Sequence, residues 1–204
     1  MKRVVSIALC LIVCLAAESF GRGSIGSAFG ALTTGRCLPK RGGTAGLGVG
    51  VGVGSPHRNS VNGYFSYGTF EYVETTLKLG LSDADEVRVT VGGDVKYQFL
   101  DAGPALGDPI DLSAGCFAEY VTDVFQFGVQ AIGSRTYILP NTTQALSPYG
   151  RLQVRLESVK SKSEIEFGLN AGVRWDVTPN FSLFGELQLD GNEGIFLGLK
   201  ESVL

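Results

Sequence analysis

The stretch Ile165-Glu-Phe-Gly-Leu-Asn-Ala-Gly-Val-Arg-Trp-Asp-Val177 alternates apolar residues with polar or small ones along its whole length. Successive side chains of a β-strand point to opposite faces, so this period of two predicts a strand with one apolar and one polar face. The same alternation recurs along the chain from residue 46 onward. It predicts ten strands, at 46–54, 62–73, 75–82, 86–100, 109–121, 123–138, 147–158, 163–177, 180–190 and 194–201.

Alternation does not say which face points inward, because a soluble lipid-binding barrel buries its apolar face and a membrane barrel turns it toward lipid. Three features favour the membrane barrel. Opposite charges gather on the polar face, aromatic residues lie near strand ends, and most strands are near the ~9–11 residues that cross a bilayer. The predicted lumen charges are Arg88, Asp94, Lys96, Arg151, Arg155, Glu157, Glu164, Glu166, Arg174, Asp176 and Glu186. The predicted interfacial aromatics are Tyr72, Phe99, Tyr120, Trp175 and Phe181.

The sequence therefore predicts an all-β fold: a closed, antiparallel, up-and-down transmembrane β-barrel of about ten strands, with eight as the alternative. An even strand number returns the chain to the periplasmic side. The tight turns at 73–76 and 177–180 then lie on that side, together with the longer connections 101–108 and 139–146. This arrangement reverses the usual trend, in which the outer loops are the long ones.

The N-terminus has the pattern of a secretory signal peptide. Lys2 and Arg3 precede an apolar run over 4–17, and Ala17 and Ser19 suit cleavage after residue 19. The run is too short for a transmembrane helix, which needs roughly 20 residues. The predicted organisation is a signal peptide over 1–19, a Gly-rich basic leader over 20–45 and a β-barrel domain over 46–204. Two interpretations of the leader stay open: it folds into the periplasmic mouth, or it is disordered, which we favour.

The segment 46–54 alternates Gly with Leu or Val. It fails the dinucleotide-binding pattern G-x-G-x-x-G, and no helix start follows it. We expect a strand with Leu and Val outward and Gly inward, and inward Gly leaves room for another segment, of which the leader is a candidate.

Composition excludes several functional classes. The chain has 17 Lys and Arg against 20 Asp and Glu, so it lacks the basic surface of a nucleic-acid-binding protein. Its one His, at position 57, argues against a His-rich metal site, and His57 with Ser60 lacks the G-x-S-x-G context of a serine hydrolase. We expect no enzymatic activity, no cofactor and no metal. Cys37 in the leader and Cys116 on an apolar face are expected to be unpaired.

The signal peptide, the turns Tyr72–Thr76 and Asp176–Asn180 and the closing hairpin Asn170–Lys200 resemble those of small outer-membrane β-barrel proteins of diderm bacteria, of the generic porin-like kind. The resemblance covers about residues 46–200. It implies a place in the outer membrane of the cell envelope, contact with its lipid, and insertion by the outer-membrane assembly machinery. One departure is the C-terminus, which ends in Leu204 where such barrels usually end in an aromatic residue.

The predicted function is a non-enzymatic outer-membrane barrel, structural or weakly pore-forming, with a polar, salt-bridged lumen. The alternatives are a small-solute channel and a soluble periplasmic lipid-binding barrel with its apolar face inward.

Overall fold

A computed structural model describes residues 27, 29–53, 59–83, 87–103, 108–121, 124–159, 162–190 and 194–203. The predicted signal peptide, His57 and Leu204 lie outside these residues. Within the described part of the chain, no helix is long and apolar enough to span a membrane.

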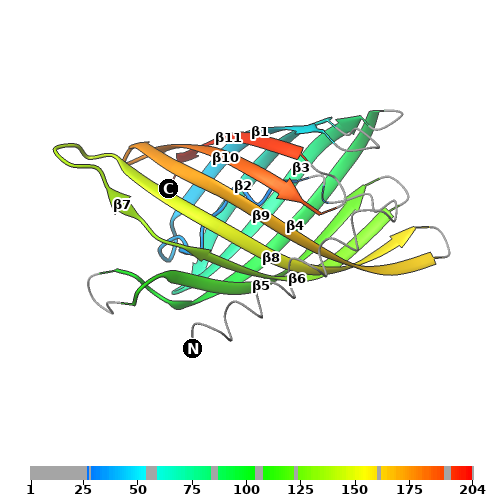
Figure 1. Ribbon diagram of the computed structural model, residues 1–204, viewed down its shortest axis with the longest axis horizontal. Coiled ribbons are helices and arrows are strands. Elements are labelled where there is room, and N and C mark those ends of the chain that lie inside the picture. Colours follow the sequence, from blue (N-terminus) through cyan, green and yellow to red (C-terminus); the bar gives the residue numbers. More distant parts are fainter. Residues whose placement is uncertain are drawn as a thin grey trace, which may run out of the picture.

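Ten antiparallel strands close into a barrel, as predicted, and the eight-stranded alternative is wrong (Figure 1). Each strand of the wall pairs with its neighbour in sequence, and β1 pairs with β11. The ten strands are β1 Gly43–Gly52, β2 Asn59–Phe70, β3 Val73–Asp83, β4 Val87–Leu100, β5 Asp111–Val121, β6 Val124–Ser134, β8 Ala145–Val159, β9 Lys162–Thr178, β10 Phe181–Leu189 and β11 Gly194–Ser202.

The predicted strand 123–138 is divided in two. β6 ends at Ser134, and Tyr137 and Ile138 form the short strand β7. β7 pairs with the first two residues of β8, Ala145 and Leu146, so it forms a local ribbon beside the wall. This ribbon projects from one end of the barrel (Figure 1).

The two ends of the barrel differ in the connections that they carry. We call the end where β1 begins and β11 ends the proximal end, and the other the distal end. The proximal connections are 71–72, 101–110, 135–144 and 179–180, whereas the distal ones are 53–58, 84–86, 122–123, 160–161 and 190–193. The longer connections therefore lie at the same end as the tight turns, as the sequence predicts.

The apolar face of the sheet points outward. Leu47, Val49 and Val51 are exposed on β1, and Val129 is 55% exposed at the middle of β6. Polar side chains from the same strands, such as Gln126 and Gln130, are buried inside. The alternative of an apolar interior is therefore wrong.

Residue 27 and residues 29–35 lie inside the barrel, and residues 36–42 continue to its proximal mouth. We call all of these residues the plug. Ser27, Phe29, Ala31, Leu32 and Thr34 are all buried. The preferred expectation of a disordered leader is therefore wrong for these residues. The physical reason is that the lumen provides both space and hydrogen-bond partners for an extended backbone.

The space comes from glycine. A Cβ at Gly48 would lie 2.8 Å from Cδ1 of Leu32, and one at Gly198 would lie 2.9 Å from the same atom. These glycines of β1 and β11 form the part of the wall against which Leu32 packs. The sequence predicted inward glycine on β1, and the structure confirms it.

Candidate functional site

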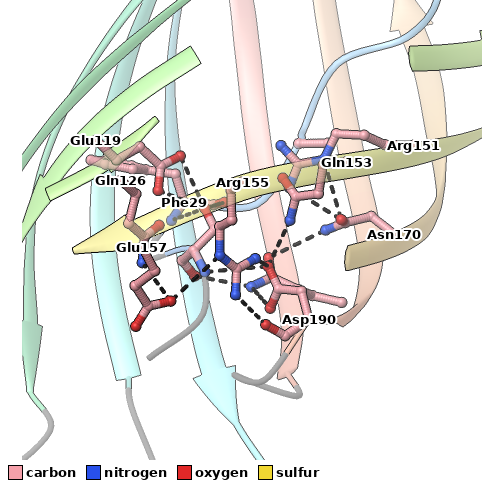
Figure 2. Close-up of polar contacts among 12 residues, drawn as sticks. Phe29, Glu119, Gln126, Arg151, Gln153, Arg155, Glu157, Asn170 and Asp190 are labelled. Carbon is pink, nitrogen blue, oxygen red and sulfur yellow. Dashed lines mark hydrogen bonds and ion pairs between the residues drawn. The ribbon is translucent and has the colours of Figure 1, made fainter. Parts of the chain in front are cut away.

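The candidate site is the lumen, where polar and charged side chains from the wall meet the plug. One cluster centres on β8 (Figure 2). Nη1 of Arg155 lies 3.0 Å from Oδ2 of Asp190, and its Nε lies 3.6 Å from Oε2 of Glu157. Nε2 of Gln153 donates to the same Asp190 oxygen at 2.8 Å. Asp190 thus accepts hydrogen bonds from two neighbouring inward positions of β8.

Arg151 belongs to the same face of β8, but its hydrogen-bond partners are uncharged amides. Its Nη2 and Nε donate to Oδ1 of Asn170 at 3.1 and 3.2 Å, and its Nη1 donates to Oε1 of Gln130 at 3.4 Å. Nδ2 of Asn170 donates in turn to Oε1 of Glu186 at 2.6 Å. The amide side chain of Asn170 therefore links the Arg151 guanidinium to the Glu186 carboxylate.

A second group of charges lies on β3, β4 and β5. Nζ of Lys78 lies 2.9 Å from Oδ2 of Asp94 and 3.9 Å from Oε1 of Glu119. Nζ of Lys96 lies 3.4 Å from Oε1 of Glu74. All five side chains are nearly fully buried, and a buried charge is tolerated only when it is paired and hydrogen-bonded.

The plug crosses the lumen lengthwise, from the distal to the proximal end. At the distal end, Ser27 N donates to Oδ2 of Asp190 at 3.2 Å, and its Oγ donates to Oε2 of Glu119 at 2.8 Å. At the proximal end, the amide of Leu38 donates to Oε2 of Glu74 at 2.9 Å. Both ends of the plug are thus held by carboxylates of the wall.

The centre of the plug is held by Glu186. Its two carboxylate oxygens accept the amides of Ala31 at 2.7 Å and Leu32 at 2.8 Å. Tyr149 Oη also donates to it, at 2.6 Å. Leu32 has φ 40°, a left-handed conformation that a branched side chain rarely adopts. The surroundings fix this conformation, because its amide binds Glu186 and its side chain packs against glycine.

Lys96 of the wall and Gly35 of the plug complete the attachment of the plug to the wall. Nζ of Lys96 donates to Oγ1 of Thr33 at 2.7 Å, to the carbonyl of Thr34 at 2.8 Å and to the carbonyl of Arg36 at 3.1 Å. Gly35 passes so close to the wall that a Cβ there would lie 2.6 Å from the carbonyl oxygen of Asp111. Most of these hydrogen bonds are made to backbone atoms of the plug, so many different plug side chains would be compatible with them.

A cavity of about 700 Å³ opens at the proximal end, beside the last residues of the plug. Its lining includes Cys37, Arg174, Asp176 and Lys200. Arg174 Nε lies 2.6 Å from Oδ1 of Asp176. Cys37 lies outside the strands, and burial raises the pKa of its thiol to about 11. Cys37 and Cys116 are both free, as predicted.

The structure places the predicted lumen charges in three groups. Those buried inside the barrel are Asp94, Lys96, Arg151, Arg155, Glu157, Glu166 and Glu186. Arg174 and Asp176 are partly exposed at the proximal cavity. Arg88 is half-buried and Glu164 is exposed, because both lie near the distal ends of their strands.

The predicted interfacial aromatics lie near strand ends. Tyr72, Phe99 and Trp175 are exposed near the proximal end, Tyr120 is exposed near the distal end, and Phe181 is half-buried. Five buried charges are missing from the predicted set: Glu74, Lys78, Glu119, Asp111 and Asp190. The first three lie on the polar phase of their strands, so strict use of the alternation would have found them.

The fold and the site together define a closed antiparallel β-barrel whose lumen is occupied by its own N-terminal segment. No family model matches the chain, and no curated protein matches it. The solved structures similar to it include β-barrels. A designed transmembrane β-barrel has 17% identity, with 82% of this chain and 100% of that chain covered and a TM-score of 0.43.

Two natural proteins are also similar. The N-terminal β-barrel domain of Pseudomonas aeruginosa OprF has 14% identity, with 81% of this chain and 99% of that chain covered and a TM-score of 0.41. The KdgM porin has 9% identity, with 79% and 99% covered and a TM-score of 0.44.

Proposed function

We propose that this protein is a non-catalytic outer-membrane β-barrel that its own N-terminal segment holds closed. The observation that carries the proposal is the plug, which crosses the lumen and is bound to the wall at both ends and at its centre. While the plug is in place, a barrel closed in this way has a structural role and forms no open pore. Any pore activity then depends on movement of the plug.

The outer surface supports a place in a membrane. A closed barrel satisfies its backbone groups through the strand pairing, which a bilayer requires, and its outward face is apolar from strand to strand. The signal-peptide pattern of residues 1–19 would deliver the chain to the envelope. We further propose that the outer-membrane assembly machinery inserts the barrel, as it does the proteins that the chain resembles.

The second candidate function is a small-solute channel. Two observations favour it: the cavity of about 700 Å³ at the proximal end and the polar lining of the lumen. In this case the plug would narrow the path without closing it.

Conductance in planar bilayers separates the two candidates. We expect the unmodified barrel to be silent. Gly35→Leu should conduct, because its side chain would have to occupy the place of the wall carbonyls beside Gly35 and would force the plug away. Gly185→Leu is the matched control, since the nearest atom to a Cβ there is a flexible side-chain carbon at 3.8 Å. Discrete current steps from the unmodified barrel, altered by neutralising Arg155 or Glu166, would instead establish the channel.

Location is tested by fractionation and gel mobility. We expect the chain in outer membranes, with a band that shifts only on boiling, because a closed barrel resists SDS until it is heated. A soluble periplasmic band without a shift would contradict the proposed location.

A further inference from the structure

The buried charges of the lumen wall are unbalanced. Among the residues that the structure describes, eight buried carboxylates face four buried cations. The carboxylates are Glu74, Asp94, Asp111, Glu119, Glu157, Glu166, Glu186 and Asp190, and the cations are Lys78, Lys96, Arg151 and Arg155. The fully buried part of the wall therefore has four more carboxylates than cations. Lys200 and Arg174, which line the proximal cavity together with Asp176, offset part of this excess. The remainder lies in a space of low dielectric, where it is costly unless it is compensated.

The plug supplies part of the compensation through neutral donors. Glu186 is the clearest case, because its four hydrogen bonds come from two plug amides, a phenol and a side-chain amide. Within the described chain, no Lys or Arg nitrogen lies within 4.0 Å of its oxygens. Glu74, Glu119 and Asp190 also accept hydrogen bonds from the plug. Departure of the plug would leave these four carboxylates without those donors.

The plug also places positive charge at the entrance. Arg36, Lys40 and Arg41 are exposed at its proximal end, and Arg36 and Lys40 line the cavity. In the closed state, a cation that enters from this end meets these side chains before it meets the acidic wall. The same segment thus compensates the carboxylates inside and repels cations outside.

We propose that the barrel, once its plug has left the lumen, conducts small cations in preference to anions. The inference rests on the proposed function, in which the plug closes the lumen. Carboxylates that line a narrow pore lower the energy of a passing cation and raise that of an anion. The path is wide enough because it accommodates an extended polypeptide that carries Phe29 and Leu32.

The test uses two unplugged variants, so that a failure of one to fold is not decisive. The first lacks residues 27–38, and the second is the full-length Gly35→Leu. Each is checked for a heat-dependent gel shift and then measured in planar bilayers with a KCl gradient. We expect the reversal potential to show a K⁺ permeability several-fold above that of Cl⁻.

Substitutions that neutralise carboxylates of the wall test whether these residues produce the ion selectivity. In the Gly35→Leu background, Glu119→Gln with Glu186→Gln should bring the two permeabilities closer together. Glu201→Gln, on the exposed outer face, should leave their ratio unchanged.

The outcomes are distinct. Silence of both variants, once folded, would overturn the proposed plug and this inference together. Conductance without ion preference, or with preference for Cl⁻, would support the proposed plug and overturn only the inference of cation selectivity. Selectivity that is unaffected by the two Gln substitutions would also overturn the inference, because the current would not pass along these carboxylates.

Discussion

Replacement of Glu186 by Ala should loosen the plug at its centre. The carboxylate accepts the amides of Ala31 at 2.7 Å and Leu32 at 2.8 Å. A hydrogen bond to a charged group contributes about 1.5–3 kcal/mol, so two such bonds are worth about 3–6 kcal/mol. Because about 1.4 kcal/mol is a tenfold change in an equilibrium constant, even the lower figure raises the undocked fraction more than roughly a hundredfold.

Hydrogen–deuterium exchange followed by mass spectrometry measures this fraction directly. Amides of residues 29–42 exchange when the plug leaves the wall, whereas strand amides exchange when the barrel opens. We expect faster uptake in the plug of Glu186→Ala and unchanged uptake in β3–β6. Asp176→Asn is the control, since Asp176 binds Arg174 and Ser182 of the wall and no plug residue.

One result would refute the reasoning. If the plug amides of Glu186→Ala exchange as slowly as those of the unmodified protein, Glu186 does not hold the plug. Faster exchange throughout the strands would instead show that the substitution destabilises the barrel as a whole.

Three further predictions concern other parts of the molecule. Alkylation of Cys37 should rise with pH up to about 11, because its buried thiol deprotonates late, and unfolding in denaturant should shift the profile to lower pH; an unshifted profile would contradict its burial. Lys78→Met should lower the barrel's free energy of unfolding by about 3–5 kcal/mol, because it leaves Asp94 buried without its cation, and additional Asp94→Leu should restore part of the loss in urea titrations. Val129→Arg should destabilise the barrel in lipid vesicles by about 2–4 kcal/mol, because it places a charge on the outward face at mid-strand, and equal stability of the two forms would argue against a lipid-facing surface.

The strands could be predicted from the sequence because one physical requirement acts at every second residue. The outward face must be apolar and the inward face must not be, so the sequence alternates with a period of two. For this reason the predicted strand 163–177 agrees closely with the observed strand Lys162–Thr178. The charges indicated which face of the sheet points inward. Arg151 and Arg155 lie on one face of β8 and need partners that only a closed interior provides. Strand ends were less accurate, as β7 shows, because turns depend on local pairing.

The plug could not be predicted in the same way. Its principal contacts use backbone amides and carbonyls, which every residue has, so its own sequence carries no periodic signal. The informative residues lie in the wall: inward Gly48 leaves space, and Glu186 has no cation partner among the described residues. A polar face with more carboxylates than cations is a sign that something else must supply donors, and here the adjoining segment of the chain supplies them.

The same imbalance explains why the plug and the lumen charges form one unit. A wall with equal numbers of acids and bases could pair its charges by itself, and the plug would then contribute only packing. Lys96 shows the opposite arrangement, because its ammonium binds Glu74 of the wall together with two plug carbonyls. Removing the plug therefore changes the partners of wall cations as well as wall carboxylates. Under the proposed function, electrostatic compensation stabilises the closed state, and an open state would require ions from solution to replace what the plug supplied.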